Sequence, residues 1–124
     1  MLLSPLKTVY EHVGGEEGLR KILIDFYHRM EKDVMIGFFF TGKDVEAIAV
    51  KQMSFLMRAM GATSSYSGKS PASAHSELPP IRRGMFDRRL RILEETLRDH
   101  NVSDEDMRSW IAFEEAFRDA VEHS

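Results

Sequence analysis

Residues 19–30, LRKILIDFYHRM, decide the fold class of this chain. Their apolar side chains recur at intervals of three and four residues, which is the spacing of one face of an α-helix. That face carries Leu19, Ile22, Leu23, Phe26, Tyr27 and Met30. Two acidic residues, Glu16 and Glu17, precede it and suit the positive end of a helix dipole. The sequence therefore predicts an amphipathic helix over about residues 16–31.

The rest of the chain shows helical rather than strand spacing. Further helices are expected over about residues 5–13, 44–60 and 82–99, the first ending at Gly14-Gly15, and a last one follows the potential N-cap Ser103. The expected apolar faces of the later three are Val45, Ile48, Gln52, Phe55, Leu56 and Ala59; Phe86, Leu90, Leu93 and Leu97; and Met107, Trp110, Ile111, Phe113, Phe117 and Val121. Residues 61–80 are rich in Ser, Gly, Ala and Pro and form a long loop, of a kind that is functional or disordered. The predicted class is all-α.

Composition limits the classes of function. The 124 residues suit one domain, 1–124, and 17 basic against 20 acidic side chains give a net charge of −3. That balance gives no general attraction to nucleic acid or to a membrane surface, and no apolar run approaches the length of a membrane span. The chain has no cysteine, which excludes disulfides, iron–sulfur clusters, thiolate-ligated haem and c-type haem attachment. We expect a soluble cytoplasmic protein.

Two polar residues, Tyr27 and Gln52, fall inside apolar stripes. A hydroxyl or amide buried without a partner costs about 1–3 kcal/mol, so each must bond inside the protein, reach solvent or serve a ligand. For Tyr27 the plain alternative is an ordinary core tyrosine whose hydroxyl bonds a backbone carbonyl or reaches the surface. For Gln52, a hydrogen bond inside the protein, exposure to solvent and contact with a ligand all stay open.

A third group, His75, lies in the Ser/Pro-rich loop, where a lone histidine is most often exposed and without a role. The run Phe38-Phe39-Phe40 reads by itself as core. Together, however, two inward polar groups on different helices, several aromatic rings and one loop histidine describe a single pocket. Such a pocket suits a flat apolar ligand with a metal at its centre.

The order of these residues resembles that of the truncated haemoglobins, short globins with a two-over-two helical sandwich. The matching motifs are Tyr10 with Gly14-Gly15, Asp25-Phe26-Tyr27, Phe39-Phe40-Thr41-Gly42, Lys51-Gln52 with Phe55, Tyr66-Ser67-Gly68, and Ala74-His75. Their spacings follow the family pattern without a gap from Tyr27 to His75, and Phe86 aligns after one inserted residue near Pro79-Pro80. The resemblance covers about residues 9–97 and is most like group I.

The resemblance implies a haem b cofactor with His75 as the iron ligand, and Tyr27 with Gln52 as the hydrogen-bonding pair on the opposite, distal side. It also places Phe39 and Phe40 against the haem face, Ile48 on the distal helix, and Lys51 with Tyr66 near the propionates. Phe55 would line the inner pocket, and Ile81 and Phe86 would contact the proximal side.

The function implied by the resemblance is reversible binding of a diatomic gas (oxygen, nitric oxide or carbon monoxide), as in oxygen transport. Nitric oxide dioxygenation is a candidate reaction and would need an external, unidentified reductase, because the chain has no flavin or dinucleotide fingerprint. The alternative from another class is a haem-free globin-fold module for regulation or interaction. Peroxidase-like chemistry ranks below both, because no distal acid–base group is assured.

One residue departs from the family pattern. By its spacing from Phe86, Arg89 falls at a helix position that lines the distal cavity in the family and is usually Val or Trp there. A bare guanidinium cannot be buried in such a place. We therefore expect either a register shifted by one residue, or an Arg89 that is paired or exposed, reaching a haem propionate or solvent.

Overall fold

The computed structural model describes residues 5–61 and 83–118. Within them the chain forms five α-helices, a short 3₁₀ segment and no strand. The elements are α1 (Pro5–His12), α2 (Gly15–Glu31), η1 (Gly37–Phe40), α3 (Val45–Ala59), α5 (Arg83–Asp99) and α6 (Asp104–Glu115). The prediction of an all-α fold is confirmed.

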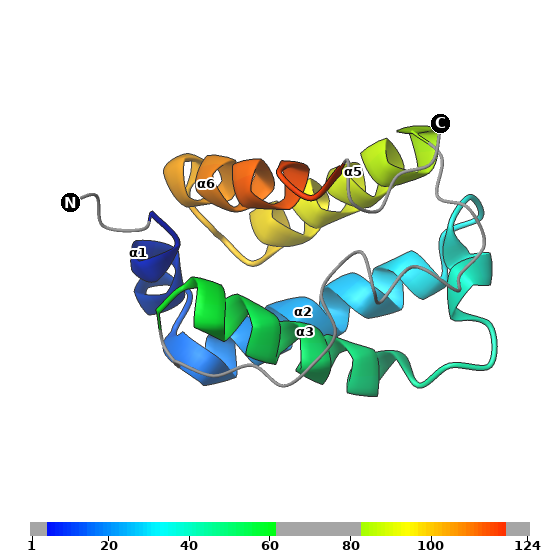
Figure 1. Cartoon of the computed structure of the whole chain (residues 1–124), viewed down its shortest axis with the longest axis horizontal. Helices are drawn as coiled ribbons and strands as arrows, with labels where there is room; N and C mark the ends of the chain where they lie inside the picture. The colour runs from blue at the N-terminus through cyan, green and yellow to red at the C-terminus, as the bar shows by residue number, and fades with distance from the viewer. Residues whose placement is uncertain (1–4, 62–82, 119–124) are drawn as a thin grey trace.

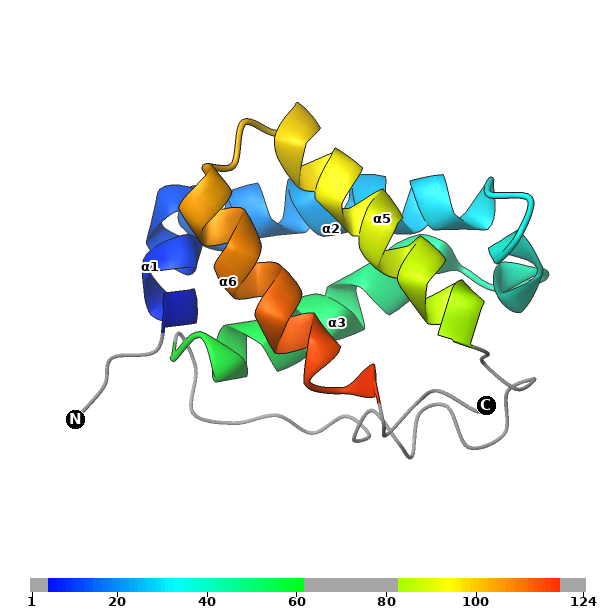
Figure 2. The same cartoon turned by 90° about the horizontal axis from the view of Figure 1, so that it is seen from above.

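The helices form two crossing layers. In Figure 1, α2 and α3 make the lower layer, α5 and α6 make the upper layer, and α1 lies at one end. Seen from above in Figure 2, α5 and α6 cross over α2 and α3. This is the predicted two-over-two helical sandwich, and its core lies between the layers, where the apolar faces of the helices meet.

A tight turn joins α1 to α2. Gly14 and Gly15 have φ of 100° and 69°, a left-handed backbone that favours glycine, and α1 ends just before them as predicted. Gly18 is needed for a different reason, because a Cβ there would lie 1.7 Å from the carbonyl oxygen of Val13. The first turn of α2 therefore packs directly on the end of the preceding segment.

The face of α2 buries the six residues that the periodicity singled out, Leu19, Ile22, Leu23, Phe26, Tyr27 and Met30. Capping is also local and follows the sequence. Ser103 accepts a hydrogen bond from the backbone N–H of Asp106 at 3.2 Å, as expected for the N-cap of α6. Asp44 caps α3 by accepting from two backbone N–H groups, each at 3.1 Å.

The buried face of α3 differs from the prediction by about one residue. Val45 and Leu56 are buried as expected, but Ala49 and Met53 complete the face. Ile48, Gln52, Phe55 and Ala59 are half-buried along its flank. Neighbouring stripes of a helix share a boundary at 3.6 residues per turn, so the pattern identifies the helix better than the centre of its buried face.

The upper layer follows its pattern with four additions. Phe86, Leu93 and Leu97 of α5 and Met107 and Trp110 of α6 are buried. The other expected positions, Leu90, Ile111, Phe113 and Phe117, are half-buried, and Val121 lies outside the described residues. The additions are Ile92 and Thr96 on α5 and two carboxylates on the buried face of α6, Asp106 and Glu114, which are 5% and 6% exposed.

Candidate functional site

Tyr27 lies at the centre of an aromatic group that joins α2 to η1. Its ring makes edge contacts with Phe26 and Phe40, with centroids 5.3 and 5.9 Å away. Phe39 stacks on Phe38 with centroids 4.2 Å apart, and both Phe39 and Phe40 are partly accessible. The structure thus brings Tyr27 and Phe40 together, as one pocket would require.

The half-buried flank of α3 contributes Ile48, Gln52 and Phe55. The ring of Phe55 packs near two rings from the α6 end, Phe113 at 6.2 Å and Phe117 at 5.6 Å between centroids. The apolar members of this group, Ile48, Phe55, Phe113 and Phe117, are half-buried. They form an apolar fringe between α3 and α6.

Of the remaining predicted residues, some are described by the structure and others lie outside its described residues. Lys51 is exposed on α3, and Phe86 is buried with the guanidinium of Arg118 4.7 Å from its ring centroid. Three of the residues lie outside the described residues: His75, Tyr66 and Ile81.

The hydroxyl of Tyr27 meets a guanidinium. The positive charge of Arg89 acts on this hydroxyl, and the guanidinium lies 5.1 Å from the ring centroid of the neighbouring Phe26. Gln52 is half-buried on α3. Burial raises the pKa of Tyr27 above its ordinary value of 10.0, against the opposing effect of the Arg89 charge. Tyr27 is therefore protonated at neutral pH and keeps an O–H group to donate.

Arg89 is paired with Glu114 of α6. Burial opposes the charge of Arg89, but the carboxylate of Glu114 and the contact with Tyr27 raise the pKa of Arg89 above its usual range. The other oxygen of Glu114 accepts from the indole N–H of Trp110 at 3.3 Å. The expectation that Arg89 must be paired is confirmed, and its partner is neither a propionate nor solvent but a carboxylate of the same chain.

Glu114 is the residue that sequence reasoning missed. It lies four residues after Trp110 and seven after Met107, so it belongs to the stripe expected to pack α6 into the core. A carboxylate in such a stripe carries the same signal as Tyr27 or Gln52, because it needs a partner. An arginine without an assigned partner, Arg89, was present in the facing helix.

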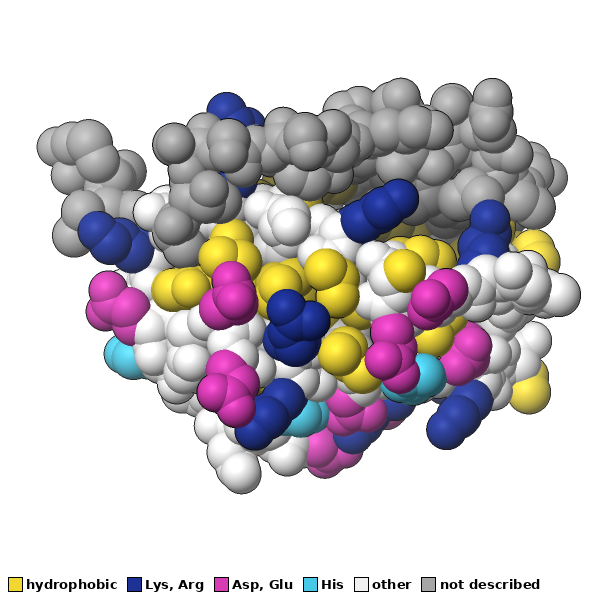
Figure 3. Space-filling view, turned by 90° about the horizontal axis from the view of Figure 1, so that it is seen from below, with side chains coloured by type: hydrophobic (Ala, Val, Ile, Leu, Met, Phe, Trp, Pro, Cys, Tyr) yellow, Lys and Arg dark blue, Asp and Glu magenta, His cyan; other side chains and the backbone are white. Residues whose placement is uncertain are grey.

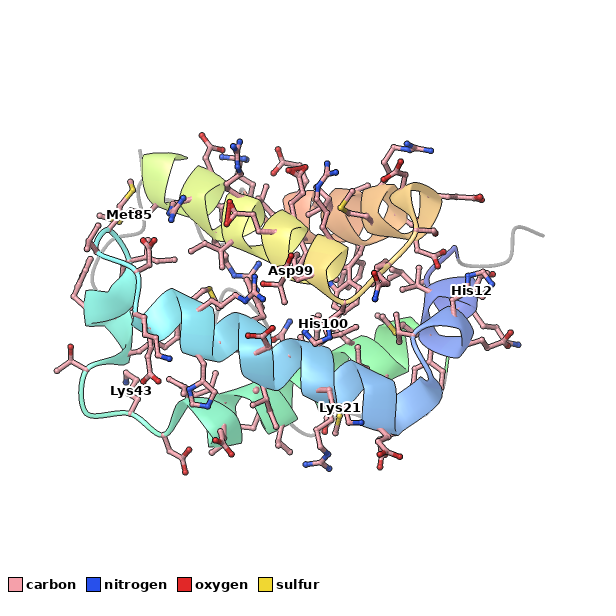
Figure 4. All side chains as sticks on the ribbon, turned by 180° about the vertical axis from the view of Figure 1, so that it is seen from behind. His12, Lys21, Lys43, Met85, Asp99 and His100 are labelled. Carbon is pink, nitrogen blue, oxygen red and sulfur yellow. The ribbon has the colours of Figure 1, made fainter. Side chains whose placement is uncertain are left out.

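The described histidines are each engaged by a carboxylate. His12 bonds Asp106 at 2.7 Å, and His28 lies between Glu31 at 2.9 Å and Glu46 at 3.0 Å. The third, His100, bonds Asp25 at 2.8 Å and lies over α2 in Figure 4. A groove of about 440 Å³ lies between His12 and His100. Both of these histidines already bond a carboxylate.

The charge pattern of the surface does not favour one class of binding partner. Figure 3 shows one face of the molecule, on which cationic and anionic side chains alternate around small apolar areas. Across residues 5–61 and 83–118, no helix combines the length and apolarity needed to cross a membrane. Within the same residues no group of acidic or histidine side chains is arranged to hold a metal ion.

Comparisons with known proteins agree with this architecture. A family model described as bacterial-like globin matches residues 8–123. A group 1 truncated hemoglobin of Tetrahymena thermophila is 30% identical over 98 residues, which are 79% of this chain and 80% of that protein.

Solved structures give the same result. The truncated hemoglobin from Tetrahymena pyriformis, in its Fe(III) form, matches with a TM-score of 0.84 at 25% identity, covering 94% of this chain and 98% of that one. The 2/2 hemoglobin from a Synechococcus species, in the cyanomet state with covalently attached heme, matches with a TM-score of 0.81 at 25% identity, over 90% and 95% of the two chains. The chain therefore belongs to the bacterial-like globin family, as a truncated haemoglobin similar to those of group 1.

Proposed function

We propose that this globin binds a b-type haem and uses it to hold a diatomic gas reversibly. The observation that carries the proposal is the setting of Tyr27, a protonated hydroxyl held among aromatic rings and beside a guanidinium. Such a group is suited to hydrogen-bond a small polar ligand inside an otherwise apolar pocket. The haem iron supplies the position at which the gas binds.

The residues of this chain fit that cofactor. A porphyrin is flat and largely apolar, and Phe40 of η1 with Ile48 and Phe55 of α3 offers it partly buried apolar contacts. The three described histidines bond carboxylates, and His75 and His123 lie outside the described residues. His75 lies in register with the family motifs, so we assign it as the iron ligand. Lys51, Tyr66, Ile81, Phe86, Phe39 and Gln52 keep the roles implied by the resemblance.

Within the pocket, Tyr27 acts as the hydrogen-bond donor. Its ring is fixed by Phe26 and Phe40, so the hydroxyl has a defined direction. Oxygen gains partial negative charge when it is held, and a charge-assisted hydrogen bond of about 1.5–3 kcal/mol opposes its release. Ile48 has no polar group and cannot do this. The pocket therefore discriminates among gases by charge.

The first experiment asks for the cofactor. Protein expressed with ample haem supply should show the intense near-ultraviolet haem absorption and release about one b-type haem per chain into pyridine. Release also distinguishes a b-type haem from a covalently attached one. A folded protein that stays colourless with added hemin would contradict the proposal and support the haem-free regulatory or interaction module.

The ligand assignment has a matched control within the chain. His75→Gly should create a site that added imidazole refills, restoring the parent absorption spectrum. His28→Gly removes a histidine that already bridges Glu31 and Glu46, so it should leave the spectrum unchanged. The reverse pattern would exclude His75 as the iron ligand.

Tyr27→Phe tests the donor. The substitution keeps nearly all the apolar volume, so haem content should change little. Loss of the hydroxyl should accelerate oxygen dissociation by about ten- to a hundredfold and carbon monoxide dissociation much less. Stopped-flow rates for both gases measure this, and equal effects on the two would show that Tyr27 acts by packing alone.

Nitric oxide dioxygenation is the enzymatic candidate for the same pocket. It yields nitrate from oxygen and nitric oxide, and repeated turnover requires an external reductase because the chain has no flavin or dinucleotide motif. Nitric oxide is added to the reduced, oxygen-loaded protein, and one nitrate formed per haem in this single turnover would support the reaction. A protein that holds oxygen and yields no nitrate would be a gas carrier or sensor instead.

A further inference from the structure

Four buried or half-buried side chains form a continuous polar chain through the interior. The indole N–H of Trp110 donates to one oxygen of Glu114, and Arg89 pairs with the other. The guanidinium of Arg89 lies 5.1 Å from the ring centroid of Phe26, whose ring contacts that of Tyr27 at 5.3 Å, and the charge of Arg89 lowers the pKa of Tyr27. The chain thus runs from α6 to α5 and reaches the aromatic group of α2 that contains Tyr27.

The direction of a hydrogen bond between Arg89 and Tyr27 follows from the donors and acceptors that each side chain carries. A guanidinium carries five N–H donors and no acceptor, so Tyr27 can only accept from Arg89. The hydrogen of the Tyr27 hydroxyl is not used in that bond. In the described part of the chain, the charged side chains that influence the pKa of this hydroxyl are Arg89, which lowers it, and Glu114, which raises it. An ordinary core tyrosine would instead spend its hydrogen on a backbone carbonyl.

We propose that Arg89, anchored by Glu114, is a positioning residue that holds Tyr27 as a hydrogen-bond donor toward the ligand. The inference rests on the proposed haem function and deepens it, because it assigns the orientation of the donor to α5 and α6. Glu114 balances the charge of the guanidinium and holds it in place, and the indole N–H of Trp110 donates to Glu114. The ligand class favoured is one that accepts a hydrogen bond, such as oxygen or a small anion, over carbon monoxide.

The test removes both charges together, because Arg89→Leu alone would strand a buried carboxylate. The variant R89L/E114Q keeps an oxygen at Glu114 for the Trp110 N–H. The matched control is R88L/D33N, which removes the neighbouring cross-link of α5, where Arg88 Nε donates to Asp33 at 2.8 Å. Asp33 also accepts from two backbone N–H groups, and the asparagine oxygen can still do so.

The first readout does not depend on ligand binding. In the full-length purified protein, carbon-13-labelled tyrosine gives NMR signals, and loss of one signal in Tyr27→Phe identifies Tyr27. Beyond the effect of burial, Arg89 lowers the pKa of Tyr27 more than Glu114 raises it. R89L/E114Q should therefore move the titration of Tyr27 to higher pH, while R88L/D33N should leave it unchanged. An unshifted Tyr27 in R89L/E114Q, or an equal shift in the control, would overturn the proposal.

The second readout uses fluoride, which can only accept hydrogen bonds, added to the ferric haem protein. R89L/E114Q should weaken fluoride binding by about tenfold, as expected for one lost hydrogen bond. In a Tyr27→Phe background the same pair of changes should add nothing, because Arg89 acts through Tyr27. An undiminished effect in that background would overturn the positioning role. A chain that takes up no haem would refute the proposed function, while the NMR titration would still decide the contact.

Discussion

Two ion-pair networks connect α2 to the upper helix layer, and they differ mainly in burial. The inner one joins Tyr27 to Arg89 and Glu114, whose side chains are 22% and 7% exposed. The outer one lies on the far side of α2, where Arg29 donates to both oxygens of Asp25 at 3.0 Å and to Asp99 at 2.8 Å. His100 also bonds Asp25, and Figure 4 shows His100 and Asp99 over α2.

The comparison shows how burial changes the contribution of an ion pair to the free energy of unfolding. The outer network includes more charged groups and hydrogen bonds, but its side chains are 28–63% exposed and water competes for them. The inner pair has few alternatives to its present partners, because each charge was removed from water when the layers packed. We therefore expect the smaller network to control stability and the larger one to contribute modestly.

The largest expected effect comes from breaking the inner pair on one side. Arg89→Leu leaves Glu114 charged and buried without its guanidinium, which should cost about 3–5 kcal/mol of unfolding free energy. Chemical denaturation followed by the fluorescence of Trp110, the single tryptophan, measures it. A loss below about 1 kcal/mol would mean that Glu114 finds water or another partner, and the contrast between the networks would fail.

Removing both inner charges should be less harmful than removing one. In R89L/E114Q no bare charge remains, and a buried ion pair replaced by uncharged groups is often close to neutral. We expect most of the loss in Arg89→Leu to be recovered, so the double-mutant cycle shows strong coupling. Additive losses in the same denaturation experiment would show that the two residues do not depend on one another.

The outer network should respond weakly and in a salt-dependent way. Arg29→Leu should cost less than about 1 kcal/mol, and the cost should shrink as salt screens exposed charges. The inner double variant should show no such salt dependence. Denaturation curves at low and high salt test both together, and a large, salt-independent loss in Arg29→Leu would place the outer network with the inner one.

The smallest effect is expected at His28, which links α2 to α3 at the surface. Hydrogen bonds to Glu31 and then Glu46 raise the pKa of His28 above its ordinary value of 6.5. A raised pKa in the folded state means that this stabilisation is fully present below about pH 6.5 and is lost as pH rises through the folded-state pKa. His28→Gln should flatten that pH dependence by a few tenths of a kcal/mol, since the pair is exposed. An unchanged slope would show that His28 contributes nothing.

Much of the fold was accessible from local patterns. The buried face of α2, the Gly14-Gly15 turn and the Ser103 cap depend on residues within a few positions of one another, and all were predicted correctly. The face of α3 was placed one residue away, because two neighbouring apolar stripes both have helical spacing and packing in the folded protein buries the one that contains Ala49 and Met53. Local spacing identifies a helix, while its partners choose the exact stripe.

The site divides in the same way. The sequence by itself determined that Tyr27 lies inside, because helical periodicity is readable along the chain. Its resemblance to the truncated haemoglobins placed Phe40 in the same pocket and, with the cost of burying a charge, implied that Arg89 could not be bare. Only the tertiary structure decided which group satisfies Arg89. Its partner Glu114 lies 25 residues away on another helix, and Tyr27 lies on a third. Pairing at that separation depends on how the two layers cross, a global property of packing that no local pattern encodes.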